Sequence, residues 1–204
     1  MTPALLPRAF YMDETVAVAR NLLGCILRRR VGRTLMAARI VETEAYLGAN
    51  DPASHARRGL RSERNESMYL EGGHAYVYFT YGMHHCLNVV TQESEVAEAV
   101  LIRAAEPLAG LGRMQRNRPN ARREHELMSG PGKLCMAMEI DRRLDGEPLD
   151  GRDLFITARE IGVEEAGIAV TPRVGIDGAG DAAHWPLRFF LAGSRHVSPH
   201  RIRG

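Results

Sequence analysis

Strand-like runs outnumber helical patterns in this sequence, and helices do not alternate with them. Runs of strand length cover residues 25–28, 35–46, 75–81, 86–91, 100–105, 153–157 and 187–192. Two helical patterns are expected beside them, one that Asp13 caps and Gly24 ends, and one that opens at Pro131. Because a doubly wound sheet needs strands and helices in alternation, this order of elements predicts an α+β fold.

Length and composition limit the classes of protein to which the chain can belong. Its 204 residues suit one compact domain, and 45% hydrophobic residues are enough to build a core. The three cysteines, Cys25, Cys86 and Cys135, are an odd number and lie far apart, which is typical of a reducing compartment. No stretch approaches the ~20 apolar residues of a membrane helix, and the first residues lack a signal-peptide pattern. We expect a soluble intracellular protein that does not associate with membranes.

The basic side chains are almost all arginine, since Lys133 is the single lysine. Arginine clusters occur at 28–30, at 57–64 and at 113–123, and the last of these segments has the polar composition of a mobile loop. Guanidinium groups match phosphate oxygens in a bidentate manner, so such clusters can hold a nucleic-acid backbone. A solvated arginine-rich surface explains them equally well. Charge alone leaves both interpretations open.

The run 35–46 carries the most informative chemistry. On a strand, the alternation of side chains places Glu42, Glu44 and Tyr46 on one face. A loop without periodicity follows from 47 to 71, and loops of this length are usually functional or disordered. Two acids and an aromatic residue before such a loop favour a site. The alternative is an edge strand with a charged outer face.

Residues 75–81 and 86–91 predict a β-hairpin with a turn near Gly82. Tyr76 and Tyr78 share one face of it, while Tyr81 and Met83 stand at its tip. Large apolar side chains at a projecting tip are expected to pack against something, and proteins that bind the minor groove insert such wedges between base steps. Ordinary cross-strand packing of aromatic residues is the alternative.

Several strings, in order along the chain from about residue 5 to 198, resemble the alkyladenine (3-methyladenine) DNA glycosylase family. They are VETEAY (41–46), SH (54–55), YVYFTYGM (76–83), LN (87–88), VLIRAAEP (100–107), GPGKLC (130–135), PRVGI (172–176) and PLRF (186–189). With this resemblance, we expect residues 1–204 to form a single DNA glycosylase domain. Its α+β fold would contain a curved, mostly antiparallel β-sheet flanked by helices, with a protruding β-hairpin.

The resemblance implies a monofunctional DNA glycosylase that excises alkylated or deaminated purines of the 3-methyladenine, 7-methylguanine, hypoxanthine and ethenoadenine class. Glu44 matches the acid that activates the attacking water, whereas Glu42 has no assigned role. Arg103 and the backbone carbonyl of Val174 match the groups that hold this water. One carboxylate can act both as general base and as electrostatic support for the developing cation. No cofactor and no metal are implied.

The resemblance also implies how the damaged base is bound. Tyr46, His55 and Tyr78 match the residues that stack around an extruded base, which offsets the loss of stacking in the duplex. Asn88 matches the pocket residue that disfavours the amino group of normal guanine. The expected partner is double-stranded DNA with damaged purines, bound by a monomer. We expect a cytoplasmic, nucleoid-associated location in a bacterium and a nuclear one in a eukaryote.

Four further residues match DNA contacts. Tyr81 matches the residue that fills the gap left in the DNA duplex by the extruded base, and Met83 lies beside it. Arg64 belongs to a loop that fits phosphate contacts, although Leu60 replaces a usual basic residue nearby. Lys133 lies in GPGK at the start of a predicted helix, a location that suits a phosphate better than a Schiff base with the sugar. We therefore expect water as the nucleophile.

Two functions other than glycosylase catalysis remain as alternatives. A metal-dependent hydrolase would use a set of histidines, a cysteine and the two acids, namely His55, His74, His84, His85, Cys86, Glu42 and Glu44. HExxH is missing, and His84 and His85 are expected to point to opposite faces of a strand. The glycosylase family that the chain resembles often has aromatic residues at these two positions, so the sequence does not predict how this hairpin tip lies against DNA. The other alternative is a nucleic-acid-binding module without chemistry.

Overall fold

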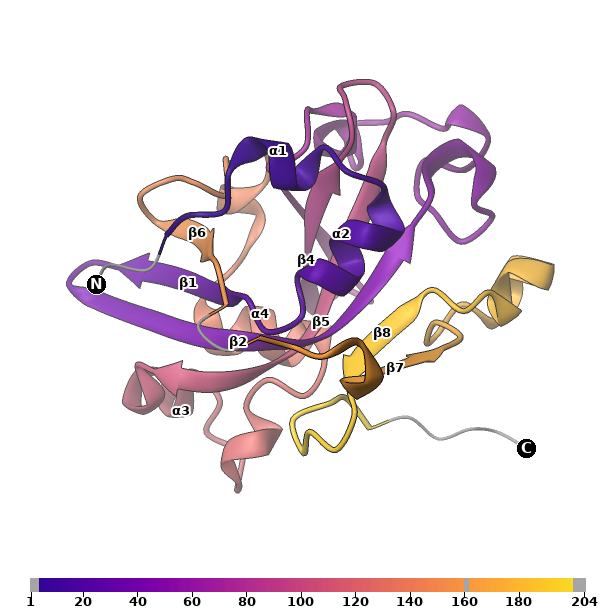
Figure 1. Ribbon diagram of the computed structural model, residues 1–204. Helices are drawn as coiled ribbons and strands as arrows, with labels where there is room; N and C mark the ends of the chain where they lie inside the picture. Colours follow the sequence, from indigo (N-terminus) through magenta and orange to yellow (C-terminus); the bar gives the residue numbers. More distant parts are fainter. Residues whose placement is uncertain (1–3, 160–161, 200–204) are drawn as a thin grey trace.

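The computed structural model describes residues 4–159 and 162–199, and its strands form one antiparallel sheet (Figure 1). The strands are β1 (Ile26–Val31), β2 (Thr34–Tyr46), β3 (Ala75–Thr80), β4 (His84–Thr91), β5 (Glu98–Ala109), β6 (Leu154–Thr157), β7 (Ile168–Thr171) and β8 (Arg188–Leu191). Six of them follow the order β3-β4-β5-β2-β1-β6, while β8 pairs with β2 and β7 pairs with β8. The prediction of an α+β fold with a mostly antiparallel sheet is confirmed.

Strand β2 pairs with three other strands of this sheet. β5 lies along one edge of β2, while its other edge pairs with β1 near Thr34 and with β8 near Glu44. The register between β2 and β5 shifts after Ala37 and again on both sides of Glu42. Such irregularities bend a strand and increase its twist, so the sheet curves around the region where β8 joins it. The alternative of an edge strand with a charged outer face is wrong, because β2 is central and Glu42 and Glu44 are both fully buried.

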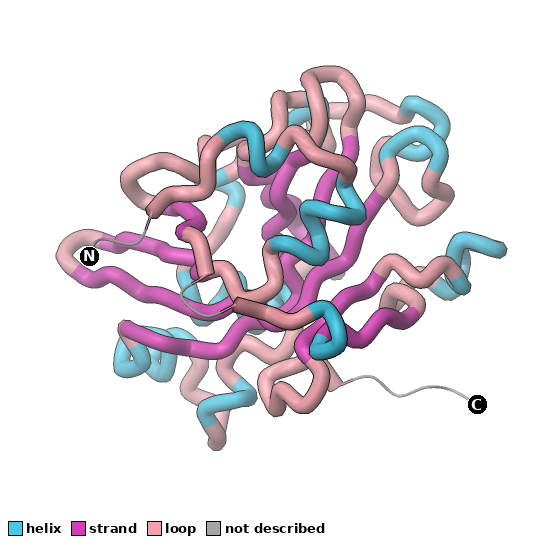
Figure 2. Tube along the Cα trace, in the orientation of Figure 1, coloured by secondary structure: helices cyan, strands magenta, loops and turns pink. Residues whose placement is uncertain are grey.

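Within the described residues, four short α-helices cover the sheet, namely α1 (Arg8–Tyr11), α2 (Thr15–Asn21), α3 (Leu111–Asn117) and α4 (Pro131–Met138). α2 packs on β2 and β5, and α4 packs on β4 and β5 from the other face (Figure 1). Figure 2 shows how much of the chain consists of loops, including the stretch between β2 and β3, which holds only short 3-10 turns. The largest core cluster includes Leu22 of the α2 end, Ile40 of β2 and Leu134 of α4. None of the helices in the described ranges is long and apolar enough to cross a membrane.

Three local predictions differ from the structure. The segment 113–123 is not a featureless loop, because α3 occupies its first part and is anchored by the fully buried Met114. Asp13 does not cap α2, since its carboxylate accepts the backbone N–H of Glu14 and the helix begins at Thr15. β7 was not predicted, and its residues are half-buried or exposed, so they carry no strong apolar pattern.

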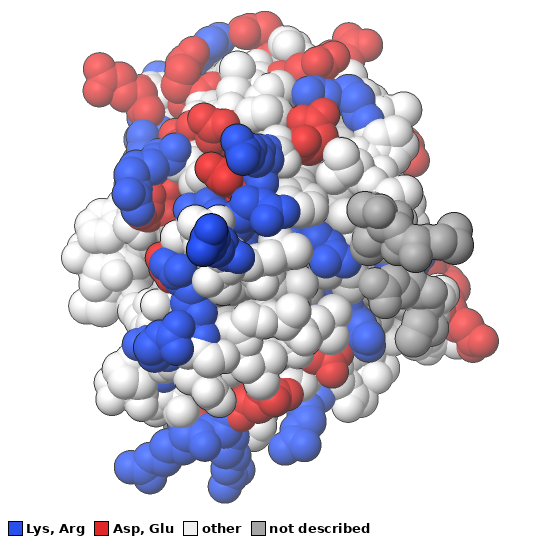
Figure 3. Space-filling view, turned by 90° about the vertical axis from the view of Figure 1, so that its left-hand side faces the viewer, with Lys and Arg blue, Asp and Glu red and all other residues white. Residues whose placement is uncertain are grey.

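Arginine is not confined to one part of the surface. Figure 3 shows Lys and Arg side chains gathered over the middle and lower parts of the face that contains the β1–β2 turn, with Asp and Glu mainly near its top. Arg30, Arg33 and Arg152 line an open groove there. This turn lies at the other end of β2 from Tyr46. The arginine pattern of the sequence therefore does not by itself mark a site.

Candidate active site

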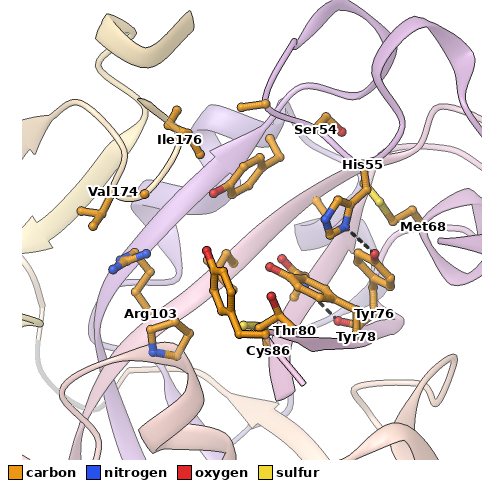
Figure 4. A pocket seen from close by; sticks show the side chains of 18 residues that line it. Ser54, His55, Met68, Tyr76, Tyr78, Thr80, Cys86, Arg103, Val174 and Ile176 are labelled. Atoms are coloured by element: carbon orange, nitrogen blue, oxygen red, sulfur yellow. Dashed lines mark hydrogen bonds between the residues drawn. The ribbon is translucent and has the colours of Figure 1, made fainter. Parts of the chain in front are cut away.

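A cavity of about 400 Å³ opens where β2, β3, β4 and β5 meet the long loop and the segment that follows β7 (Figure 4). Its lining includes the four residues expected around a base, which are Tyr46, His55, Tyr78 and Asn88. Arg103 and Val174, expected to hold the water, and Tyr81, expected to contact the duplex, line it as well. Residues without an expected role also line it, among them Met68, Tyr76, Cys86, Leu101, Pro131 and Ile176. The strands supply its floor, and the two loop segments supply opposite rims.

Glu44 lies directly behind the wall of this cavity. Its Oε1 accepts the backbone N–H of Val174 at 2.7 Å, and its Oε2 accepts the hydroxyl of Tyr46 at 2.9 Å and Nη1 of Arg103 at 3.3 Å. The side chain is fully buried, while its three donors all line the cavity. The structure thus brings Glu44, Arg103 and Val174 together. The contact from Val174 is its N–H, and the water contact expected from its carbonyl stays a prediction.

Glu42 lies on the same face of β2, but its carboxylate is bound by two arginines and a serine. Its carboxylate accepts hydrogen bonds from Nε of Arg103 at 2.9 Å and from Nε of Arg188 at 2.7 Å. Ser198 donates to it twice, from the backbone N–H at 2.7 Å and from Oγ at 2.8 Å. Burial alone would raise the pKa of Glu42, but the charges of Arg103 and Arg188 outweigh it and hold the pKa below its ordinary value.

His55, Tyr76 and Tyr78 form an aromatic wall (Figure 4). The rings of His55 and Tyr78 meet edge to face with centroids 4.6 Å apart, and those of Tyr76 and Tyr78 lie 5.3 Å apart. Nδ1 of His55 is 2.7 Å from the hydroxyl of Tyr76. Burial, helped by the charges of Arg64 and Arg57, lowers the pKa of His55 from 6.5 to about 4, so the ring is neutral near pH 7. Burial also raises the pKa of Tyr76 and of Tyr78 above 10.

Tyr46 forms another part of the lining and is supported from behind. The guanidinium of Arg173 lies 4.7 Å from the centroid of its ring. Arg173 is buried, forms a two-pronged ion pair with the buried carboxylate of Asp51 and donates to the backbone carbonyl of Ala45. Arg173 lies in the string PRVGI, but no role was expected for it, and Asp51 was not predicted as a site residue. An aspartate in a long loop gives no sign of its partner 122 residues away.

Asn88 lies on the floor of the cavity in β4. Its side chain is buried, and its Nδ2 donates to the backbone carbonyl of Tyr76 at 3.0 Å, which fixes the orientation of the amide. Cys86 lies two residues before it on the same face, with its pKa raised by burial. The three cysteines are free and buried.

The hairpin tip projects from the rim. Tyr81 and Met83 are 82% and 67% exposed, so the alternative of cross-strand packing within the protein does not hold for these two residues. The expectation that they pack against a bound partner stays a prediction. Tyr81 has φ 50°, a left-handed conformation that side chains rarely adopt. Arg64 packs on the hairpin, with its guanidinium 5.7 Å from the Tyr78 ring and Nη2 3.4 Å from the carbonyl of Phe79.

Lys133 and the two histidines lie near the start of α4. Nζ of Lys133 donates to Oγ of Ser129 at 3.4 Å, and Lys133 does not line the cavity. His84 lies against Gly132, where a Cβ would come within 3.0 Å of the imidazole Cγ. His85 instead contacts Phe79 with ring centroids 5.0 Å apart. In the described part of the chain, no three His, Cys, Asp or Glu side chains gather as a metal site.

Comparison with known proteins agrees with this geometry. The sequence model of the methylpurine-DNA glycosylase (MPG) family matches residues 9–195. A protein of Bdellovibrio bacteriovorus named "Putative 3-methyladenine DNA glycosylase" is 47% identical over 196 residues, which are 95% of this chain and 98% of the relative. Proteins of the same name from Methanocella arvoryzae and Carboxydothermus hydrogenoformans are 48% and 47% identical, each over 95% of this chain and over 96% and 98% of their own length. The chain belongs to the methylpurine-DNA glycosylase family.

Proposed function

We propose that this protein is a monofunctional DNA glycosylase that hydrolyses the N-glycosidic bond of damaged purines in duplex DNA. The observation that carries the proposal is the position of Glu44, held by Arg103 immediately behind an aromatic cavity. A base turned out of the duplex would enter the cavity and stack on Tyr46 and Tyr78. Its sugar would then face the wall that covers Glu44. Stacking offsets the few kcal/mol lost when a base leaves the duplex.

Glu44 would act as general base and as the negative charge beside the developing sugar cation. An ionised carboxylate offers about four acceptor positions, and three donors occupy Glu44 here. One position therefore stays open for a water molecule. Arg103 and the carbonyl of Val174 would hold this water in line with the sugar carbon, so that binding supplies the orientation that the reaction needs.

Of the other side chains, one would recognise the base and the rest would contact the DNA. The amide of Asn88 is held by the backbone carbonyl of Tyr76. It would meet the exocyclic amino group of guanine, which hypoxanthine and adenine derivatives lack at the same position. The exposed Tyr81 would enter the duplex where the base has left, with Met83 beside it. Lys133 and Arg64 would contact phosphates.

The proposed substrates are the alkylated and deaminated purines named above. The cationic bases 3-methyladenine and 7-methylguanine leave without further protonation, whereas hypoxanthine and ethenoadenine need a proton on the leaving base. Lys133, the single amine side chain, bonds to Ser129 outside the cavity. This location supports water rather than an amine as nucleophile, with an abasic site as product.

The decisive experiment measures base release from duplexes that each carry one defined lesion, with wild type and Glu44→Gln compared in single turnover. We expect the variant to lose roughly 100-fold or more of the rate, the size typical of a lost general base, while it still binds damaged duplex. A DNA-binding module without chemistry predicts no release by either protein.

Two controls separate the remaining alternatives. A metal-dependent hydrolase would lose activity in EDTA, whereas the proposed enzyme keeps its rate. Borohydride would trap a covalent complex if an amine attacked the sugar, and we expect none. If Glu44→Gln releases damaged purines at the wild-type rate, Glu44 is not the general base, although the protein would still be a glycosylase.

A further inference from the structure

Next to the cavity lies a buried charge cluster of which the proposed reaction uses only Arg103. It consists of Glu42, Arg103 and Arg188, with Ser198 bound to the glutamate. Glu42 is 0% exposed and accepts four hydrogen bonds, three at Oε1 and one at Oε2. It does not line the cavity, so it meets no base or water molecule bound there. Its function must therefore act through the groups that it holds.

The segment after β8 completes this cluster. β8 pairs with β2 at Glu42–Glu44, and the chain then turns back so that Ser198 reaches Glu42 (yellow in Figure 1). Ser198 is 6% exposed, and its Oγ also lies 3.4 Å from Nη2 of Arg103. A residue 156 positions away in sequence thus contacts both the glutamate and the arginine beside the candidate base.

These contacts leave Arg103 little freedom. Its Nε is bound to Glu42, its Nη2 to Ser198 and its Nη1 to Glu44. A guanidinium is planar and rigid, so fixing two of its nitrogens fixes the direction of the third. Glu42 and Ser198 therefore set the angle at which Nη1 meets Glu44. The contact from Arg103 to Glu42 is 2.9 Å long, whereas those to Glu44 and Ser198 are 3.3 and 3.4 Å long.

We propose that Glu42 and Ser198 are positioning residues that hold Arg103 against Glu44, so that the segment after β8 is part of the active site. The proposal rests on the proposed function, in which Arg103 orients the attacking water. Removing the Ser198 hydroxyl would loosen the guanidinium while the backbone N–H of residue 198 still reaches Glu42. Small displacements of an orienting group cost much of the rate, although they leave the base-binding cavity intact.

The test compares Ser198→Ala and Ser198→Thr with wild type, because Glu42→Gln would leave two buried arginines poorly compensated and endanger folding. Ser194→Ala is the matched control, since its hydroxyl lies in the same segment and contacts the backbone N–H of His196 rather than Glu42. Each protein is assayed for single-turnover release of 7-methylguanine with enzyme in excess. Affinity for a duplex with a stable abasic-site analogue is measured in parallel.

We expect Ser198→Ala to release base roughly tenfold more slowly with unchanged DNA affinity, and Ser198→Thr to restore the rate to within about twofold of wild type. Ser194→Ala should match wild type in both measurements. The proposal is overturned if Ser198→Ala keeps the wild-type rate, if its affinity falls in step with its rate, or if Ser194→Ala loses as much. A wild type that releases no base would instead refute the proposed function.

Discussion

His55 shows how burial decides the protonation state of one side chain. Its ordinary pKa of 6.5 falls to about 4 because burial and two nearby arginines disfavour the charged ring. The unfolded chain therefore takes up this proton near pH 6.5, whereas the folded protein takes it up only near pH 4. The stability gained by keeping the ring neutral is fully present above the pKa of 6.5 in the unfolded chain. It is lost as pH falls from there towards the pKa of about 4 in the folded protein.

We predict that the free energy of unfolding of wild type falls by about 2 kcal/mol more between pH 7 and pH 5 than that of His55→Asn, which cannot take up this proton. Urea unfolding at the two pH values measures the difference. His184→Asn is the control, because His184 is exposed. If wild type and His55→Asn respond equally to pH, the imidazole does not have a depressed pKa in the folded protein.

At the scale of elements, the hairpin of β3 and β4 keeps its tip free of the rest of the protein. Tyr81 is 82% exposed, so its ring contributes little to folding, and its φ of 50° strains the backbone. Glycine adopts this conformation without strain, but it also gives the unfolded chain more freedom. These two effects oppose each other.

We predict that Tyr81→Gly changes the free energy of unfolding by less than about 1 kcal/mol, while single-turnover base release and affinity for damaged duplex both fall. Tyr81→Phe is the matched control, since it keeps the ring and the backbone strain and should bind DNA like wild type. A large loss of stability in Tyr81→Gly would mean that the ring holds the hairpin in the free protein. Unchanged DNA affinity would contradict insertion.

The elements show what the sequence could predict and where it fell short. The run of β2 predicted a strand and placed Glu42 and Glu44 on one face, because alternate side chains of a strand point to the same face. β7 and α3 were missed because each buries little, with Met114 the one buried residue of α3. Short elements of this kind form through their neighbours and leave no local pattern.

For the candidate site, the resemblance supplied residues that lie within matched strings, such as Glu44 and Arg103. It did not supply the support behind them. Asp51 meets Arg173, and Ser198 meets Glu42, because the pairing of β8 with β2 brings the segments before and after β8 next to β2. Contacts across 122 and 156 residues follow from topology and not from local sequence, so no pattern in the chain could reveal them.

At the scale of the whole molecule, burial against the curved sheet keeps the titratable side chains of the cavity lining in one protonation state over a wide range of pH. Burial raises the pKa of Tyr46, Tyr76 and Tyr78 above 10 and that of Cys86 above 9, so these four groups keep their protons. His55, with its pKa near 4, stays neutral. Burial would lower the pKa of Arg103, but the charges of Glu44 and Glu42 raise it above its ordinary value. None of these lining groups changes its charge between about pH 6 and pH 9.

We predict that single-turnover release of the cationic base 7-methylguanine is constant within about twofold from pH 6 to pH 9, since none of the lining groups just named titrates in this range. Release of the neutral base hypoxanthine should slow as pH rises, because its leaving base needs a proton that the solution must supply. Parallel pH profiles on matched duplexes distinguish the two. An inflection for 7-methylguanine between these limits would show that a group at the site gains or loses a proton there, and a flat profile for hypoxanthine would show that an internal acid protonates the leaving base.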